Sequence, residues 1–249
     1  MCASSILRKV VGSIVFLFLL LSGQFAHAGS FTFLTQNGFG QNAEADITTF
    51  NGGITVTLKN FLQNPTSDDQ LISGLIFSVT GATAPASLTS SSGNTSNINV
   101  NSPSNKNFDP TKPDGYYNPV ASSPLTHWAA SGTGTVTLTT LSGMKPNELI
   151  IGPDNLGRTD GTGVYANANP SISNHDPTVI GSATFTLSEL GVTSDSTISD
   201  VIFQFGTGPE NVPSVQVTPV PEPATLTLLG IGIAGLAGYG WRRRKMATI

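Results

Sequence analysis

The middle of the chain alternates apolar and polar residues with a period of two. The alternation is clearest over 54–59, 75–80, 135–139, 183–188 and 201–205, and weaker runs cover 31–33 and 45–50. In each run one face is apolar and the other is largely Thr or Ser, as in a strand with one side in the core. The inward-facing side chains would be Ile54, Val56, Leu58, Leu75, Phe77, Val79, Val136, Leu138, Ala183, Phe185, Leu187, Val201, Phe203 and Phe205.

Turn-forming sequences separate these runs, and no stretch between 29 and 218 has apolar residues at helical spacing. The turn signals are Asn51-Gly52-Gly53, Asp114-Gly115, Asp160-Gly161 and Gly206-Thr207-Gly208. Many short strands joined by such turns predict an all-β fold. We expect an antiparallel β-sandwich or jelly-roll-like domain with long polar loops over 29–218.

One polar region interrupts the strand pattern. Between 83 and 107, 16 of 25 residues are Ser, Thr or Asn, and five prolines lie between Pro103 and Pro124. Such a composition buries little apolar surface, so we expect a long polar, Pro-rich insertion over 83–125 that begins with a mobile loop. Two small domains divided in this region are the alternative organisation.

The first 28 residues have the three parts of a secretory signal peptide. Arg8 and Lys9 precede an apolar run over 10–21, and Ala26-His27-Ala28 supplies the small residues that signal peptidase recognises. A helix over 10–21 reaches only about 18 Å, less than the ~30 Å of a hydrocarbon core. We therefore predict a signal helix that is cleaved after Ala28, with an uncleaved anchor as the alternative.

The last 30 residues predict a single membrane crossing. No charged residue occurs between Pro223 and Trp241, a length that spans ~30 Å as a helix over 224–241. A basic cluster follows immediately, formed by Arg242, Arg243, Arg244 and Lys245. The positive-inside rule places this cluster in the cytoplasm and the preceding body outside.

A Pro-Glu-Pro triplet precedes this apolar segment. Pro221 and Pro223 fix φ and lack backbone donors, so the triplet is expected to be extended, and Glu222 gives it a single charge. The triplet, apolar segment and basic cluster, in this order over 219–245, resemble the PEP-CTERM sorting signal. An ordinary C-terminal anchor with a Pro-rich hinge is the alternative interpretation.

The resemblance implies a route of export. In that family an exosortase, an integral-membrane cysteine protease, recognises the signal and cleaves near the triplet. The family occurs in Gram-negative bacteria that make extracellular polysaccharide, and its members are commonly matrix, surface or secreted proteins. The expected partners are therefore signal peptidase, the exosortase, the inner membrane transiently, and extracellular polysaccharide. The expected location is a membrane-anchored precursor that becomes a cell-surface or extracellular protein.

The charge and the cysteine content of the body argue against some classes of function. The net charge is −4, but six of the 11 basic residues lie in the two terminal segments. Residues 29–220 hold five basic and fourteen acidic residues, a net charge of −9, which argues against nucleic acid as a partner. The single cysteine, Cys2, lies in the signal segment, so the mature chain would have no disulfide, thiolate nucleophile or thiolate metal site.

The two histidines of the body, His127 and His175, do not carry a recognisable catalytic or zinc pattern. No G-x-S-x-G sequence and no H-x-x-x-H spacing occurs. We therefore predict no catalytic residue, no metal site, no cofactor and no enzymatic activity. A secreted hydrolase with an unrecognised site is the weakest of three alternatives.

A carbohydrate-binding or calcium-dependent adhesive module is the stronger alternative. The segment Asp154–Gly161 has calcium-loop character but departs from the EF-hand pattern, and Asp68-Asp69 lies in an expected turn. Tyr116, Tyr117 and Trp128 would stack on sugar rings if they are exposed; the alternative is that they pack on the edge of the sandwich or, for Trp128, in its core. In addition, Asn94-Thr95-Ser96 matches a glycosylation sequon.

Overall fold

The computed structural model describes residues 29–36, 40–103, 105–142, 145–159, 161–208 and 210–217. The predicted signal helix over 1–28, with Ala26 and Ala28, lies outside these residues. So do the predicted transmembrane helix over 224–241, the triplet Pro221-Glu222-Pro223 and the basic cluster 242–245. Within the described ranges, no helix is long and apolar enough to cross a membrane.

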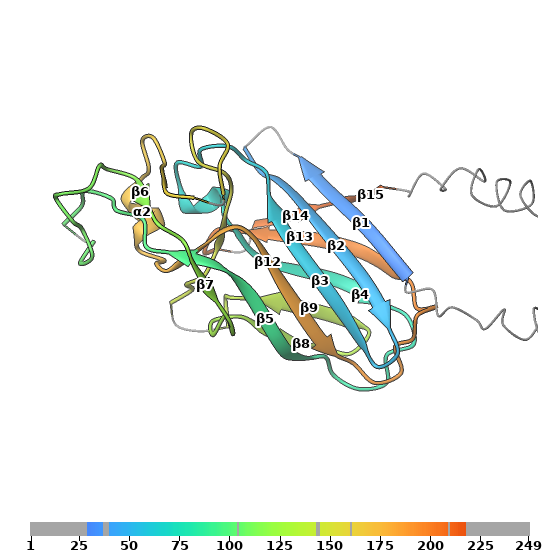
Figure 1. Ribbon diagram of the computed structural model, residues 1–249. Coiled ribbons are helices and arrows are strands. Elements are labelled where there is room, and N and C mark those ends of the chain that lie inside the picture. Colours follow the sequence, from blue (N-terminus) through green and yellow to red (C-terminus); the bar gives the residue numbers. More distant parts are fainter. Residues whose placement is uncertain are drawn as a thin grey trace, which may run out of the picture. The chain divides into compact units, whose positions relative to one another are not determined.

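Two layers of strands face each other in the described residues (Figure 1). One layer contains, in hydrogen-bonded order, β15 (Val215–Val217), β1 (Gly29–Gln36), β2 (Asn42–Phe50), β3 (Gly53–Asn60), β12 (Thr178–Ser188), β5 (Ser87–Ser96) and β7 (Val120–Ser122). The other contains β14 (Glu210–Pro213), β13 (Ile198–Phe205), β4 (Ile72–Val79), β9 (Thr135–Thr139) and β8 (Ala129–Ser131). The short β10 (Ile150–Ile151) pairs with both β4 and β12 and links the layers. The predicted all-β class is confirmed.

Among the described strands the pairing is antiparallel with one exception, which corrects one detail of the expected antiparallel β-sandwich or jelly-roll-like domain. Ile150 and Ile151 of β10 pair in parallel with Val179 and Ile180 of β12. A parallel neighbour requires a long crossover rather than a hairpin. The excursion over 152–177 supplies that crossover, because it leaves the end of β10 and returns the chain to the start of β12.

The core between the layers is built from the alternating positions that the sequence predicts. Every one of the fourteen side chains expected to point inward is buried, from Ile54 in β3 to Phe205 in β13. Trp128 joins them from the segment before β8, with its ring centroid 4.6 Å from that of Phe185 in β12. Since one apolar cluster takes residues from both layers, burial of this surface holds them together.

The outer face of β1, β2, β3, β12 and β5 is rich in hydroxyl groups. Two of these, Thr57 Oγ1 and Thr184 Oγ1, lie 3.2 Å apart across the β3–β12 pair. The charges on this face largely neutralise one another, because Lys59 Nζ lies 2.6 Å from Glu44 Oε1 and 2.7 Å from Asp46 Oδ2. This layer therefore presents a polar surface of low net charge.

The prediction of a mobile loop over 83–107, at the start of the insertion, is wrong for ten of its 25 residues. Residues 87–96 form β5, which pairs with β12 and with β7. The strand adds to a sheet whose core is already covered, so it needs few apolar side chains of its own. Leu88 packs against the core, while Ser91 is buried and donates to the Leu125 carbonyl at 3.2 Å. Backbone pairing thus outweighs the polar composition here.

A second apolar cluster lies at one end of the sandwich, beneath the loops 61–71, 97–119 and 152–177. Its members are Leu71, Ile98, Val100, Tyr117, Leu149, Ile151, Tyr165, Ala168, Ile172 and Ile180. The two-stranded sheet of β6 (Tyr116–Tyr117) and β11 (Gly163–Val164), the short helix α2 (Pro170–Ser173) and the 3-10 turn η1 (Asp68–Gln70) lie around it. We call this region the loop end.

The first and last strands of the body lie side by side. Thr32 of β1 pairs with Val217 of β15, and the Gly29 N–H donates to the Ser194 carbonyl at 3.1 Å. Gly29 lies at the end of the sandwich away from the loop end, because it is opposite Thr49 of β2, and β12 finishes at this same end with Ser188 opposite Gly53. β15 runs toward this end and stops at Val217, opposite Thr32.

Candidate functional site

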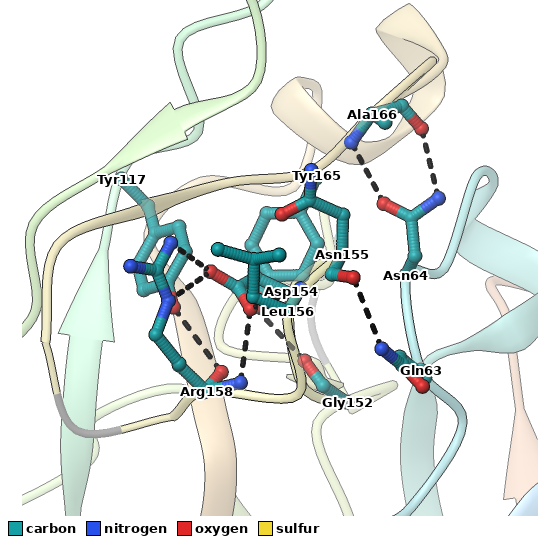
Figure 2. A network of polar contacts seen from close by, with 10 residues as sticks. All are labelled: Gln63, Asn64, Tyr117, Gly152, Asp154, Asn155, Leu156, Arg158, Tyr165 and Ala166. Atoms are coloured by element: carbon teal, nitrogen blue, oxygen red, sulfur yellow. Dashed lines mark hydrogen bonds and ion pairs between the residues drawn. The ribbon is translucent and has the colours of Figure 1, made fainter.

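Asp154 accepts hydrogen bonds from several groups of one turn at the loop end (Figure 2). These contacts test the hypothesis that the segment binds calcium. Its buried carboxylate accepts the backbone N–H groups of Leu156 at 2.8 Å and Arg158 at 2.9 Å. Arg158 Nε and Nη2 donate to Oδ2 at 2.9 and 2.7 Å. Burial alone would raise the pKa of Asp154, but these hydrogen bonds outweigh it and hold the pKa below its usual value.

This arrangement corrects the calcium interpretation of Asp154–Gly161. A calcium ion needs oxygen atoms that converge on it, whereas both oxygens of Asp154 already face N–H donors. A cation there would have to displace the Arg158 guanidinium. Among the residues that the structure describes, no group of three or more His, Cys, Asp or Glu side chains is placed to hold a metal ion.

The three aromatic residues proposed to stack on sugars have different surroundings. Tyr117 is buried against Tyr165, with ring centroids 4.9 Å apart, and donates its hydroxyl to the Arg158 carbonyl at 3.2 Å. Burial also raises the pKa of the Tyr165 hydroxyl. Trp128 is a core residue that donates to the Glu148 carbonyl at 2.9 Å. Only Tyr116 remains partly exposed, so the structure does not bring the three together as one platform.

Tyr116 lines a polar hollow of about 300 Å³ on the loop end. Lys112 Nζ lies 5.0 Å from the centre of its ring, within the range of a cation–π contact. The side chains around the ring are mainly amides, with one carboxylate, one ammonium and one hydroxyl group. The lining residues are Ser96, Asn97, Asn99, Asn107, Asp109, Lys112, Tyr116 and Asn118.

The floor of this hollow is fixed by a buried asparagine, which the sequence analysis did not single out. Asn99 Nδ2 donates to the carbonyls of Asp109, Lys112 and Pro113 at 3.1, 3.3 and 3.0 Å. Asn99 Oδ1 accepts the Asp109 N–H at 2.7 Å. One amide thus satisfies three backbone carbonyls and one N–H of the loop, in addition to the loop's own backbone hydrogen bonds. The alternation of Ile98 and Val100 with Asn97 and Asn99 is the signal that could have revealed this element.

A second asparagine stabilises the same loop from within. Asn105 Nδ2 donates to the carbonyls of Ile98 and Val100 at 3.2 and 3.0 Å, and Asn105 Oδ1 accepts the Asn107 N–H at 3.0 Å. The loop therefore has an ordered internal network although its composition is polar.

Another hollow, of about 490 Å³, lies farther along β5. It is lined by Ser92, Gly93, Asn94, Ala121, Ser122, Ser123, Ser182 and Thr184. These residues carry hydroxyl groups and one amide but no charge and no aromatic ring. Asn94 of the predicted sequon is exposed here, on the pair of β5 with β7.

His127 is not arranged as a catalytic base. Its Nδ1 lies 3.5 Å from both the Thr126 hydroxyl and Glu148 Oε1. A nucleophile–base–acid triad instead uses the two opposite ring nitrogens. The buried Glu148 carboxylate also accepts the backbone N–H groups of Thr126 at 3.2 Å and His127 at 2.9 Å. The Glu148 carboxylate therefore joins its own loop to the segment at Thr126 and His127.

His175 is likewise held by the backbone. Its Nδ1 donates to the Pro146 carbonyl at 2.6 Å, and Nε2 lies 3.7 Å from Asp68 Oδ2. The nearby Ser171 hydroxyl accepts the Asp68 N–H at 3.2 Å. The acid that the sequence places in a turn, Asp68, therefore lies beside His175, but no hydroxyl is hydrogen-bonded to the ring in the described residues.

Comparison with known proteins addresses the C-terminal segment. A search of curated proteins and a search of solved structures give no match. A family model described as the PEP-CTERM protein-sorting motif matches residues 219–245. The match covers the triplet, the apolar segment and the basic cluster, so the predicted resemblance is confirmed. Residues 219–245 are therefore a PEP-CTERM protein-sorting motif, and this segment supports export of the chain and its sorting by an exosortase.

Proposed function

We propose that this chain is the precursor of a surface or extracellular-matrix protein. An exosortase cleaves it near Pro221-Glu222-Pro223, and the released body associates with extracellular polysaccharide. The observation that carries the proposal is the sorting motif over 219–245. The signal peptide expected over 1–28 supports it, because export of the body is required before a membrane protease can process its C-terminal end.

The properties of the described body are compatible with a protein that functions outside the cell. Its fold is held by two apolar clusters and contains no cysteine, so its stability is independent of the redox state of the surroundings. Its outer face is hydroxyl-rich, and its charges there are paired. Such a surface stays hydrated beside a polysaccharide and does not attract polyanions strongly.

We propose further that the body acts by binding rather than by catalysis. The contacts of His127 and His175 support this part, since each ring is used to hold loops together.

Intact-mass measurement of the protein from its native host, with and without its exosortase, tests the processing step. The expected product begins at Gly29 and ends near Glu222 only when the exosortase is present. Glu222→Gln removes the single charge of the triplet and is expected to reduce processing. Glu210→Gln is the matched control, because it removes an acid from the body just before the motif. A chain that ends at Ile249 in both strains would overturn the proposal.

The second candidate is a carbohydrate-binding module. The hollow at Tyr116 favours it, because an aromatic ring surrounded by amides is suited to sugars. The calcium-dependent form of this candidate receives no support from Asp154, whose oxygens face Arg158.

A further inference from the structure

We propose that the hollow at Tyr116 binds one sugar residue of a neutral, hydroxyl-rich glycan. The inference rests on the proposed association with polysaccharide and assigns it to a site. The hollow lies on the loop end, where the end of β5, the loop that follows it and β6 meet (Figure 1, green). Loops that are positioned by a rigid sheet are a common place for binding sites.

The exposed amides of the hollow supply the hydrogen-bonding capacity that a sugar needs. The side chains of Asn97, Asn107 and Asn118 are exposed and hydrogen-bond to no other residue in the described ranges. Each amide offers two donors and an acceptor, and each sugar hydroxyl is both a donor and an acceptor. Three free amides around one ring thus match several adjacent hydroxyl groups.

Tyr116 supplies the apolar part of the site. Its ring is partly exposed, and an aromatic face packs against the C–H groups of a pyranose. Lys112 Nζ lies over one face of the ring, 5.0 Å from its centroid, so a sugar that packs on that face displaces the ammonium, which then offers three N–H donors at the edge of the hollow. Tyr116 is held in place by its backbone, which pairs with Val164 in β11 and accepts the Asn99 N–H at 2.8 Å.

The charges in the hollow favour a neutral ligand. Asp109 and Lys112 carry opposite charges and both line it. Hydrogen bonds from the Thr111 hydroxyl and N–H lower the pKa of Asp109, so it stays ionised at neutral pH. The net charge of the hollow is therefore close to zero, while the body as a whole is negative. A polyanion would be repelled by the body and would gain no compensating charge here.

The hollow is built before a ligand arrives. Asn99 holds the segment 109–113, and the Ser96 hydroxyl accepts the Asn118 N–H at 2.9 Å. Preorganisation of this kind lowers the entropy lost on binding. At about 300 Å³ the site is at the small end of ligand pockets, which fits one residue of a longer chain. Several copies on one polymer would then add avidity to weak individual contacts.

The test uses the processed protein purified from its host and the host's own extracellular polysaccharide. Anion exchange divides the polysaccharide into a neutral and an acidic fraction, and each is cast into native gels for affinity electrophoresis. We expect the neutral fraction to retard the wild-type protein. Tyr116→Ala and Asn118→Ala should weaken this retardation at least about tenfold in apparent Kd, an amount equal to about 1.4 kcal/mol.

Matched controls separate the site from the rest of the surface. Phe61→Ala removes an exposed aromatic residue elsewhere, and Asn155→Ala removes an exposed amide outside the hollow, so neither should alter retardation. Asn118→Ala changes only an exposed side chain, so it tests the site even if Tyr116→Ala does not fold. Tyr116→Phe keeps the ring and should retain most of the binding.

The outcomes also separate this inference from the proposed function. Equal retardation of wild type, Tyr116→Ala and Asn118→Ala would overturn the site and leave polysaccharide association standing. Absence of retardation by the neutral fraction, with normal processing at the triplet, would overturn the site and the association but not the sorting. Retardation by the acidic fraction alone would overturn the neutral-ligand assignment.

Discussion

The carboxylate of Asp154 receives the Nε–H of Arg158 at 2.9 Å and an Nη2–H at 2.7 Å, from within a turn where the carboxylate is fully buried. The guanidinium is partly exposed, so water screens the pair on one side. Two backbone N–H groups complete the shell of the carboxylate. Gly163 closes the site, because a Cβ there would collide with Asp154 Oδ2.

Asp154→Ala is expected to lower the free energy of unfolding by about 2–3 kcal/mol, since it removes several hydrogen bonds to a charged group and leaves donors unpaired. Urea unfolding at neutral pH measures this. Asp46→Ala is the control: Asp46 pairs with Lys59 on the open face and should cost only ~0.5–1 kcal/mol. Equal costs for the two variants would contradict the structural role of Asp154.

Calcium should not stabilise the body through the Asp154 turn. The melting temperature of the purified protein is expected to stay the same when millimolar calcium is exchanged for a chelator, because the Asp154 carboxylate is already paired with the Arg158 guanidinium at 2.7 Å. A rise in Tm with calcium that disappears in Asp154→Ala would restore the calcium-loop hypothesis.

Stability should depend on pH through Asp176. Burial raises the pKa of this carboxyl from 3.8 to about 7, against hydrogen bonds from Ile98 and Thr178 and the nearby charge of Lys145. The folded state therefore binds more protons than the unfolded state between these values. The free energy of unfolding should fall as pH rises from about 4 to about 7, by at most ~1.4 kcal/mol per pH unit.

Asp176→Asn tests this dependence. The variant should be more stable than wild type at pH 8 and should lose most of the slope between pH 5 and 7, measured by urea unfolding. Glu189, whose pKa is also raised by burial, contributes in the same direction and leaves a residual slope. An unchanged slope in Asp176→Asn would show that the Asp176 carboxyl is not the titrating group.

Phe185 of β12 is expected to be one of the most sensitive core positions. It is fully buried and packs on Trp128, a residue of the segment that leads into β8. Phe185→Ala should cost about 3–5 kcal/mol in unfolding free energy. Thr186→Ala, at the next position on the outer face, should cost less than about 1 kcal/mol. Similar costs at both positions would indicate a different register of β12.

Asn99 is expected to determine the order of the loop around Tyr116. Asn99→Ala removes four hydrogen bonds and should cost about 2 kcal/mol, because three backbone carbonyls lose the donor that Asn99 supplies and the Asp109 N–H loses its acceptor. Hydrogen exchange of residues 105–115 should accelerate while that of β3 and β12 stays slow. Asn97→Ala, which removes an exposed amide, should leave exchange unchanged. Equal exchange in both variants would rule out this role for Asn99.

The strands that could be predicted are those with strong chemical contrast between their faces. Val56 and Phe185 are apolar while their neighbours are threonines, and burial follows that contrast directly. β5 gives no such contrast, because Ser90, Ser91 and Ser92 occupy both faces. Its structure depends on pairing with β12, a partner about 90 residues away in the chain. Periodicity carries no information about such a distant pairing.

The candidate hollow was predictable only in part. Tyr116 attracts notice as an aromatic residue in a polar segment, yet Tyr117 beside it is buried, and only the register of β6 against β11 determines which of the two is exposed. The role of Asn99 depends on carbonyl groups that converge from 109–113. Such a convergence is a property of the folded loop and not of any single position.

The pairing of β1 with β15 has a mechanical consequence. Because β15 runs antiparallel to β1, its last residue, Val217, and the first residue of β1, Gly29, both end these strands on the side away from the loop end. In the uncleaved precursor, a pull on either connection is therefore applied to one pair of adjacent strands. The hollow at Tyr116 lies on the loop end, so the strand pair that carries this load is not part of it.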